Sequence, residues 1–229
     1  MRKFAETVAW PRDQGFAIDV AVNERLDFIR RTYSHLLIEL CGVGIVASMA
    51  MKSEVLMRNL GALALVGLLG LFLVVPRLIA PGASKASQYA GAALVTAFYG
   101  VLVAPLAAFL PTEVLLQAFI LTSCVFGGLT AYVFVTKKDF SAWGGALRMA
   151  LFAAIGMSLI GFFWGFGSTT YFWFNIGVVV LFCGFILYYT SNILRHYPTN
   201  AHVAASVQLL GAFVNLFIRI ALILASSRD

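Results

Sequence analysis

Seven long apolar segments constrain this chain more than any other feature of its sequence. Each has about 20 residues, the length that an α-helix needs to cross the roughly 30 Å hydrocarbon core of a bilayer. Helices also satisfy their own backbone hydrogen bonds, which lipid cannot do. The segments cover approximately residues 33–51, 60–80, 87–110, 114–135, 144–165, 171–191 and 203–225. The sequence therefore predicts an all-α integral membrane protein, a bundle of seven transmembrane helices.

Composition agrees with a membrane protein. Charged residues make up 11% of the chain, against about a quarter in soluble proteins. Pro76 and Arg77 fall near the end of the second segment, where we expect them to shorten or kink the helix. Cys41, Cys124 and Cys183 lie inside predicted spans without CxxC spacing, so we interpret them as packing residues rather than metal ligands or disulfide partners.

Polar residues precede the first span and predict the domain organisation. Residues 1–32 form a cytoplasmic tail, 33–225 the bundle and 226–229 a short C-terminal tail. Apolar residues recur at helical spacing near the end of the N-terminal tail, at Val22, Leu26, Ile29 and Tyr33. They predict a helix near 22–32 that either lies on the membrane surface or leads into the first span. We favour the lead-in.

Basic residues predict the orientation. Twelve of the 16 Lys and Arg residues lie in the N-terminal tail and in alternate loops, and the other four are Lys52, Arg58, Arg219 and Arg228. The positive-inside rule then predicts a cytoplasmic N-terminus and a C-terminus on the opposite side. Because the basic residues are dispersed over loop ends, where they meet anionic lipid head groups, the net charge of +6 requires no nucleic-acid partner.

Ionisable residues inside a span are the first candidates for function. Glu39 is the only acid well inside a predicted span, and His35 lies four residues earlier on the same helix face. Such a pair could bind a proton or a cation; the structural alternative is a hydrogen-bonded pair facing a neighbouring helix. Arg219 is the other charge within a span. We expect it to extend to the outer surface, with a bundle-facing contact as the alternative.

Other polar residues have structural interpretations. Asp139 precedes the fifth span, where it is expected to cap the helix N-terminus. Asn192 and Asn215 are expected to bridge helices. His196 and His202 are assigned to the loop between spans six and seven. Because the chain contains no signature of a known catalytic, cofactor or metal site, we do not expect an enzyme.

Four stretches resemble the Bax inhibitor/YccA family of seven-helix membrane proteins, and more specifically its bacterial YccA branch. They are "RRTYSHLL", "AYVFVTKKDFSAWGG", "ILYYTSNIL" and "VNLFIRIALILASSRD". The resemblance implies the inner membrane of a bacterium and a partner, the membrane-anchored protease FtsH. Other family members are pH-sensitive calcium leak channels whose sensor is a pair of acids on spans six and seven. Those positions match Tyr189 and Ala212 here, and a tyrosine is neutral where such a carboxylate titrates.

Two functional hypotheses follow. In the first, the protein binds and modulates FtsH, as inhibitor or substrate, and offers its tail to the cytoplasmic ATPase. In the second, it is a proton or cation leak that uses Glu39 and His35, with Arg219 as a gate. The sequence makes no prediction about an oligomeric state.

Overall fold

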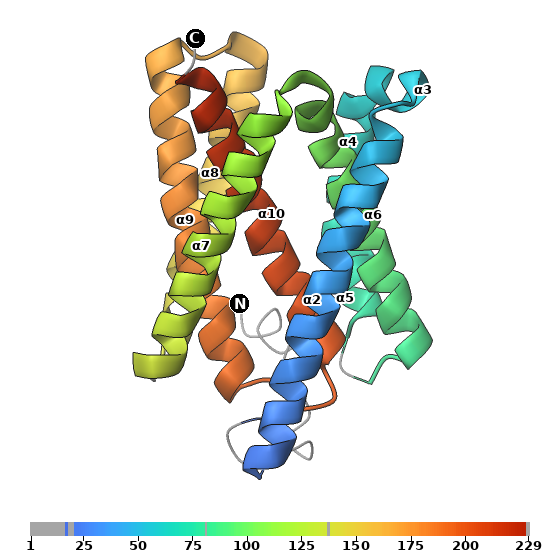
Figure 1. The fold of residues 1–229 in the computed structure, drawn as a ribbon, viewed down its shortest axis with the longest axis vertical. Coiled ribbons are helices and arrows are strands. Elements are labelled where there is room, and N and C mark those ends of the chain that lie inside the picture. Colours follow the sequence, from blue (N-terminus) through green and yellow to red (C-terminus); the bar gives the residue numbers. More distant parts are fainter. Residues whose placement is uncertain (1–16, 18–20, 81, 137, 228–229) are drawn as a thin grey trace. The chain divides into compact units, whose positions relative to one another are not determined.

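The computed structural model describes residue 17 and residues 21–80, 82–136 and 138–227. Its helices are α2 (Val22–Ala50), α3 (Glu54–Arg58), α4 (Leu60–Leu73), α5 (Val75–Leu78), α6 (Lys85–Phe109), α7 (Thr112–Thr136), the 3-10 helix η1 (Ser141–Trp143), α8 (Gly144–Trp164), α9 (Ser168–Arg195) and α10 (His202–Ser226) (Figure 1). Within the described residues they provide seven spans that are long and apolar enough to cross a membrane, with α4 and α5 counted as one. The predicted all-α bundle of seven transmembrane helices is confirmed.

The first helix begins earlier than the predicted span. Helix α2 starts at Val22, so the segment near 22–32 forms its first turns and continues directly into the span. Of the predicted N-terminal tail, residues 1–16 and 18–20 lie outside the described residues, as do 228–229 of the C-terminal tail.

The second span is interrupted where the sequence predicts a kink. Helix α4 ends at Leu73 and α5 begins at Val75, with Pro76 in its first turn. Proline lacks an amide N–H and its ring collides with the carbonyl four residues earlier, so a continuous helix is disfavoured there. Arg77 donates to the carbonyl oxygen of Leu73 at 2.6 Å, which satisfies an acceptor that the break leaves free.

The helices group into two compact units. The first comprises residues 1–108 and 193–210, and the second comprises residues 109–192 and 211–229. The long helices α9 and α10 each contribute residues to both units.

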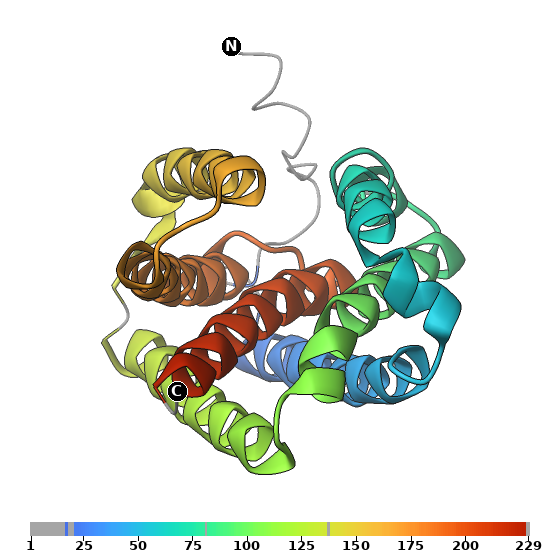
Figure 2. The same ribbon diagram turned by 90° about the horizontal axis from the view of Figure 1, so that it is seen from above.

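Close backbone approach holds the first unit together. A Cβ atom built on Gly42 of α2 would lie 2.7 Å from Thr96 Cγ2 of α6, and one on Gly100 of α6 would lie 2.5 Å from Val46 of α2. Small residues therefore let α2 and α6 pack more tightly than larger residues would allow, which is how helices associate in lipid. Helix α4 also lies against α6 (Figures 1 and 2).

Close approach recurs in the second unit. Helices α8 and α9 lie side by side (Figure 2), with Gly184 of α9 against Leu147 of α8 and Gly144 of α8 against Tyr188 of α9. Within the same unit, the ring of Phe213 in α10 makes edge contacts with two rings of α7. Gly144 and Gly184 thus lie at a helix contact in the second unit, as Gly42 and Gly100 do in the first.

Candidate functional site

A buried carboxyl group lies at a contact between α2 and α10 in the first unit. Glu39 is 7% exposed and belongs to the buried face of α2. Its Oε1 lies 2.8 Å from the Oγ of Ser206, a side chain with no exposed surface. Its Oε2 has no hydrogen-bond partner among the residues that the structure describes. An acid at such a depth is costly to keep charged, which makes it the leading candidate for function.

The surroundings of Ser206 suit both protonation states of this acid. Ser206 Oγ lies 2.8 Å from Glu39 Oε1 and 2.9 Å from the carbonyl oxygen of Val203. A serine hydroxyl carries one proton, so it can donate to only one of these oxygens at a time. When Glu39 is ionised, the hydroxyl donates to the carboxylate. When Glu39 is protonated, the acid donates to Ser206 Oγ and the hydroxyl turns to Val203, so rotation of one hydroxyl accommodates the gain or loss of a proton.

Two histidines lie one helical turn from this pair, toward the amino ends of both helices. The rings of His35 and His202 are stacked with centroids 5.0 Å apart, and the ring of Tyr89 in α6 lies 5.6 Å from His35. His35 precedes Glu39 by four residues, and His202 precedes Ser206 by four. The helices therefore run parallel in this register, and the two pairs are separated by about 6 Å along the helix axes.

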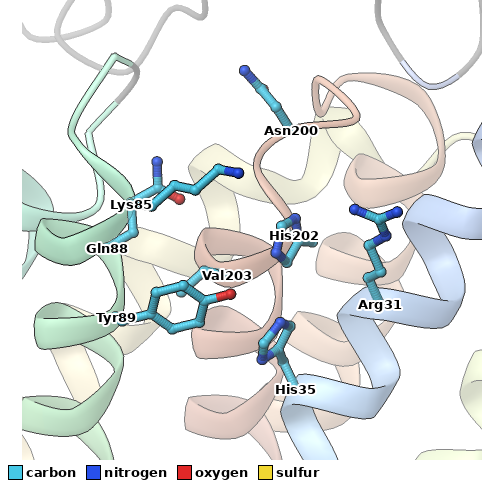
Figure 3. A pocket seen from close by; sticks show the side chains of 8 residues that line it. All are labelled: Arg31, His35, Lys85, Gln88, Tyr89, Asn200, His202 and Val203. Carbon is cyan, nitrogen blue, oxygen red and sulfur yellow. The ribbon is translucent and has the colours of Figure 1, made fainter.

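The histidines line a pocket of about 200 Å³ at the amino ends of α6 and α10. Its lining is Arg31, His35, Lys85, Gln88, Tyr89, Asn200, His202 and Val203 (Figure 3). We call it the basic pocket, because its lining contains two permanent positive charges, two histidines and no acid. Asp27, outside the lining, forms an ion pair with Arg31 at 2.6 Å, and both side chains are more than half exposed.

Apolar side chains follow this polar cluster farther along both helices. Val43, one turn beyond Glu39 in α2, is 6% exposed, and Leu209 and Leu210 of α10 are fully buried. Among the described residues of the first unit, Glu39 is the only charged side chain that is buried, and the buried residues that follow it on α2 are apolar.

The contacts of Glu39 and His35 differ from those that the sequence suggests. His35 and Glu39 lie on one face of α2, but their contacts are with α10, Glu39 with Ser206 and His35 with His202. His202 was assigned to the loop, whereas it is the first residue of α10. The four-residue spacing from His202 to Ser206 was the signal that sequence reasoning missed.

Arg219 faces protein rather than the outer surface, contrary to the favoured expectation. In the second unit, its Nη1 donates to the Oδ1 of Asn175 in α9 at 3.0 Å, and its guanidinium carbon lies 5.4 Å from the ring centroid of Phe174. An amide acceptor and an aromatic face together stabilise a charge that lipid would not. The structure therefore shows the alternative expectation for Arg219, a contact with a neighbouring helix.

Asp139 binds a free amide, as expected, although not at the start of α8 itself. Its Oδ1 accepts from the amide N–H of Ser141, the first residue of η1, at 2.9 Å. Ser191 of α9 donates to the same oxygen at 3.4 Å and accepts from the amide of Phe140 at 3.0 Å. These bonds fasten the loop between α7 and α8 to α9, so the role of Asp139 is structural.

Each of the two asparagines makes a hydrogen bond within its own helix, and their bridging of helices stays a prediction. Asn192 donates to the hydroxyl of Tyr188 at 3.4 Å, and Asn215 donates to the carbonyl oxygen of Gly211 at 2.8 Å. Arg148 of α8 donates to the same Tyr188 hydroxyl at 3.4 Å. The Tyr188 hydroxyl thus forms a polar contact between α8 and α9.

Neither of the two positions matched to the family's acids is acidic in this chain. Tyr189 packs its ring against Phe185, with centroids 5.3 Å apart, and Ala212 is buried. The cysteines Cys41, Cys124 and Cys183 are free thiols. Within the described residues, no three His, Cys, Asp or Glu side chains gather where they could hold a metal ion.

Comparison with known proteins decides the family. The profile of the family described as "Inhibitor of apoptosis-promoting Bax1" matches residues 25–229. The chain belongs to the Bax inhibitor family. Proteins of this family are not known as enzymes, and the seven spans described above suit a multi-pass membrane protein of this family.

Relatives from several kingdoms share this family. The chain is 39% identical over 134 residues to Bax inhibitor 1 of Schizosaccharomyces pombe, which is 57% of this chain and 49% of that protein. It is 32% identical over 118 residues to Protein lifeguard 4 of Mus musculus, which is 52% of this chain and 49% of that protein. An uncharacterized protein of Pseudomonas aeruginosa is 29% identical over 215 residues, which cover 90% of this chain and 94% of that protein. The alignments thus span about half the length of the two eukaryotic relatives and nearly all of the bacterial one.

Proposed function

We propose that this Bax inhibitor family protein is a proton leak in which Glu39 binds the proton. The observation that carries the proposal is the buried Glu39 carboxyl group, whose single hydrogen-bond partner among the described residues accommodates both protonation states. A calcium or other cation leak was the broader hypothesis from the sequence. The geometry favours the proton.

The route to Glu39 supports this choice of ion. The lining of the basic pocket includes Arg31 and Lys85 and no acid, so a divalent cation would be repelled at its mouth. A proton can instead pass between side chains that both donate and accept one, and His35 and His202 lie one turn from Glu39 and Ser206. Val43 and the leucines of α10 are buried beyond the cluster, so in this proposal they would have to move for a proton to pass farther.

The decisive experiment measures flux in proteoliposomes. We would record proton entry with an internal pH dye and calcium entry with a calcium dye, for the wild type and for Glu39→Gln, which keeps the shape of the side chain and removes its titration. The matched control is Glu24→Gln, an exposed acid of the same helix. We expect proton flux in the wild type and the control and a loss of about a hundredfold or more in Glu39→Gln, the magnitude typical of removing a proton-transfer group. Equal flux in all three, or none in any, contradicts the proposal.

A second candidate function is modulation of an FtsH-type protease. It is supported by the resemblance to the YccA branch, by the nearly full-length match to a bacterial relative, and by the charged first turns of α2, where Glu24, Asp27 and Arg30 are exposed. The tail that precedes these turns would then be offered to the ATPase of the protease.

Deletion of residues 1–16 tests this candidate. The deletion keeps Ala17, whose amide donates to the carbonyl oxygen of Tyr197 at 2.9 Å, so the rest of the fold retains that contact. We expect the shortened chain to insert normally, to lose co-purification with FtsH from native membranes, and to lose its effect on FtsH proteolysis. Unchanged co-purification and proteolysis would contradict the candidate.

Both candidates assume the inner membrane of a bacterium with the N-terminus in the cytoplasm. The asymmetry of Lys and Arg supports this orientation. Labelling of single introduced cysteines at the two chain ends with a membrane-impermeant maleimide tests it. We expect the C-terminal cysteine to react in intact cells and the N-terminal one to react only after lysis; labelling of both ends on one side contradicts the orientation.

A further inference from the structure

The basic pocket collects positive charge without a compensating acid in its lining. We propose that it is a binding site for a phosphate-bearing anion, with the head group of an anionic phospholipid as its occupant. The pocket is also the mouth of the proposed proton route, but the test of this proposal measures binding alone and makes no use of Glu39, so the two proposals can fail separately.

Charge is the first argument. Arg31 and Lys85 are permanently positive, and the stacked imidazoles of His35 and His202 belong to the same lining. Like charges that share a small space repel one another, so an anion bound among them lowers their electrostatic energy. Asp27 offsets part of this charge through its bond to Arg31, but that ion pair is solvent-exposed and so contributes little.

Helix ends add to the positive potential. Lys85 is the first residue of α6 and His202 is the first residue of α10, so both helices begin at the pocket. The amino end of a helix carries about half a positive charge and presents amide N–H groups that have no partner within the helix. Helix amino ends are for this reason common sites for phosphate groups.

The pocket also has the room and the donors that a phosphate group requires. Its volume of about 200 Å³ is more than ten times the roughly 10–15 Å³ needed for one water molecule. Figure 3 shows the amine of Lys85 and the hydroxyl of Tyr89 directed toward the space beside His202. Phosphate oxygens accept from such groups, and an ammonium or guanidinium donor strengthens each bond.

Position in the membrane favours a lipid over a soluble phosphate. The pocket lies where α6 and α10 begin, hence at the height of the head groups rather than in the hydrocarbon core. In the proposed orientation this is the cytoplasmic leaflet, which is the leaflet with anionic head groups that attract basic residues. The exposed side chains of Lys85 and Tyr89 leave the pocket open to such a head group.

Native mass spectrometry of the delipidated protein in detergent tests the proposal. The probes are phosphatidylglycerol, zwitterionic phosphatidylcholine, and inorganic phosphate without a lipid. The variants are Lys85→Gln, Arg31→Gln and the double variant. The controls are Arg30→Gln, next to Arg31 but outside the lining, and Lys138→Gln, an exposed lysine in the other unit. All four positions are exposed, so the substitutions leave the fold intact, and equal thermal unfolding without lipid would verify this.

We expect the wild type and both controls to retain phosphatidylglycerol in preference to phosphatidylcholine. Each pocket variant should bind phosphatidylglycerol roughly fivefold more weakly, the change expected for one basic residue near a membrane surface. If inorganic phosphate binds to the wild type and not to the double variant, the site exists and a soluble phosphate compound can occupy it. If phosphatidylglycerol binds and inorganic phosphate does not, the occupant is the lipid. Equal binding of phosphatidylglycerol by the wild type and the double variant, or loss of equal size in the controls, overturns the proposal.

Discussion

The contact between Glu39 and Ser206 predicts a measurable coupling between two helices that are far apart in the sequence. The change is Ser206→Ala, which removes one hydroxyl and nothing else. Because Glu39 is 7% exposed and Ser206 is not exposed at all, water does not replace the lost hydrogen bond. The variant therefore leaves the carboxyl group buried without the partner that the structure gives it.

The size of the effect follows from the geometry and the environment. Hydrogen bonds between helices in a membrane contribute about 0.6 kcal/mol on average and about 1.7 kcal/mol at most. At 2.8 Å with both groups buried, and with a carboxyl group as one partner, this bond belongs at the upper end of that range. Hydrogen bonds to charged groups reach about 1.5–3 kcal/mol in proteins generally. We therefore expect a coupling energy of about 1–2 kcal/mol.

A double-mutant cycle isolates this energy from the other consequences of each change. Free energies of unfolding would be measured by SDS titration in mixed micelles, followed by far-UV circular dichroism, for the wild type, Ser206→Ala, Glu39→Met and the double variant. Methionine is used because glutamine would keep an oxygen that accepts from Ser206. The control is Ser48→Ala in α2, whose exposed hydroxyl bonds only within its own helix, and we expect it to change stability by less than about 0.5 kcal/mol.

Additivity would refute the reasoning. If the cost of the double variant equals the sum of the two single costs to within about 0.3 kcal/mol, the two side chains do not interact. The register of α2 against α10 would then be wrong, and with it the arrangement of His35 beside His202. A coupling of the expected size supports both pairs, because the same four-residue spacing relates them on each helix.

Two further predictions concern packing and a buried charge. Gly100→Ala places a methyl group at the α2–α6 contact, whereas Gly44→Ala places one in open space. Thermal unfolding should show the Gly100→Ala variant to be less stable than the Gly44→Ala variant by about 1–3 kcal/mol. Equal stability of the two variants would contradict the tight contact. Asn175→Ala removes the acceptor of Arg219 and should lower the free energy of unfolding by about 1–3 kcal/mol. The control Asn59→Ala, at an exposed position between α3 and α4, should lower it by less than about 0.5 kcal/mol. Equal losses at the two asparagines would show that the guanidinium does not depend on this amide.

Local features of the fold were predictable because each depends on a short stretch of sequence. An apolar run of about 20 residues specifies a spanning helix without reference to any other part of the chain. Pro76 interrupts its helix through its own ring, and Asp139 accepts from an amide two residues away. The first helix extends beyond its apolar run, since it also includes the polar turns that begin at Val22.

The partners of the candidate site residues were not predictable in this way. Glu39 was recognised from its depth in a span, but its partner lies 167 residues later. The apolar run begins after His202 and so predicts a loop there, although α10 extends beyond the apolar part of its sequence and begins at His202. Arg219 was expected to extend to the surface, since no sequence pattern shows that Asn175 lies at its height in another helix.

The sequence by itself determined that this protein is a seven-span membrane bundle, where its helices break, and to which family it belongs. The tertiary structure decided which polar side chains meet, namely Glu39 with Ser206, His35 with His202, and Arg219 with Asn175. The physical reason is that crossing a bilayer depends on the hydrophobic length of a single helix. A polar contact depends instead on the register and rotation of two helices, which are set by the packing of small residues such as Gly42 and Gly100 along their whole lengths.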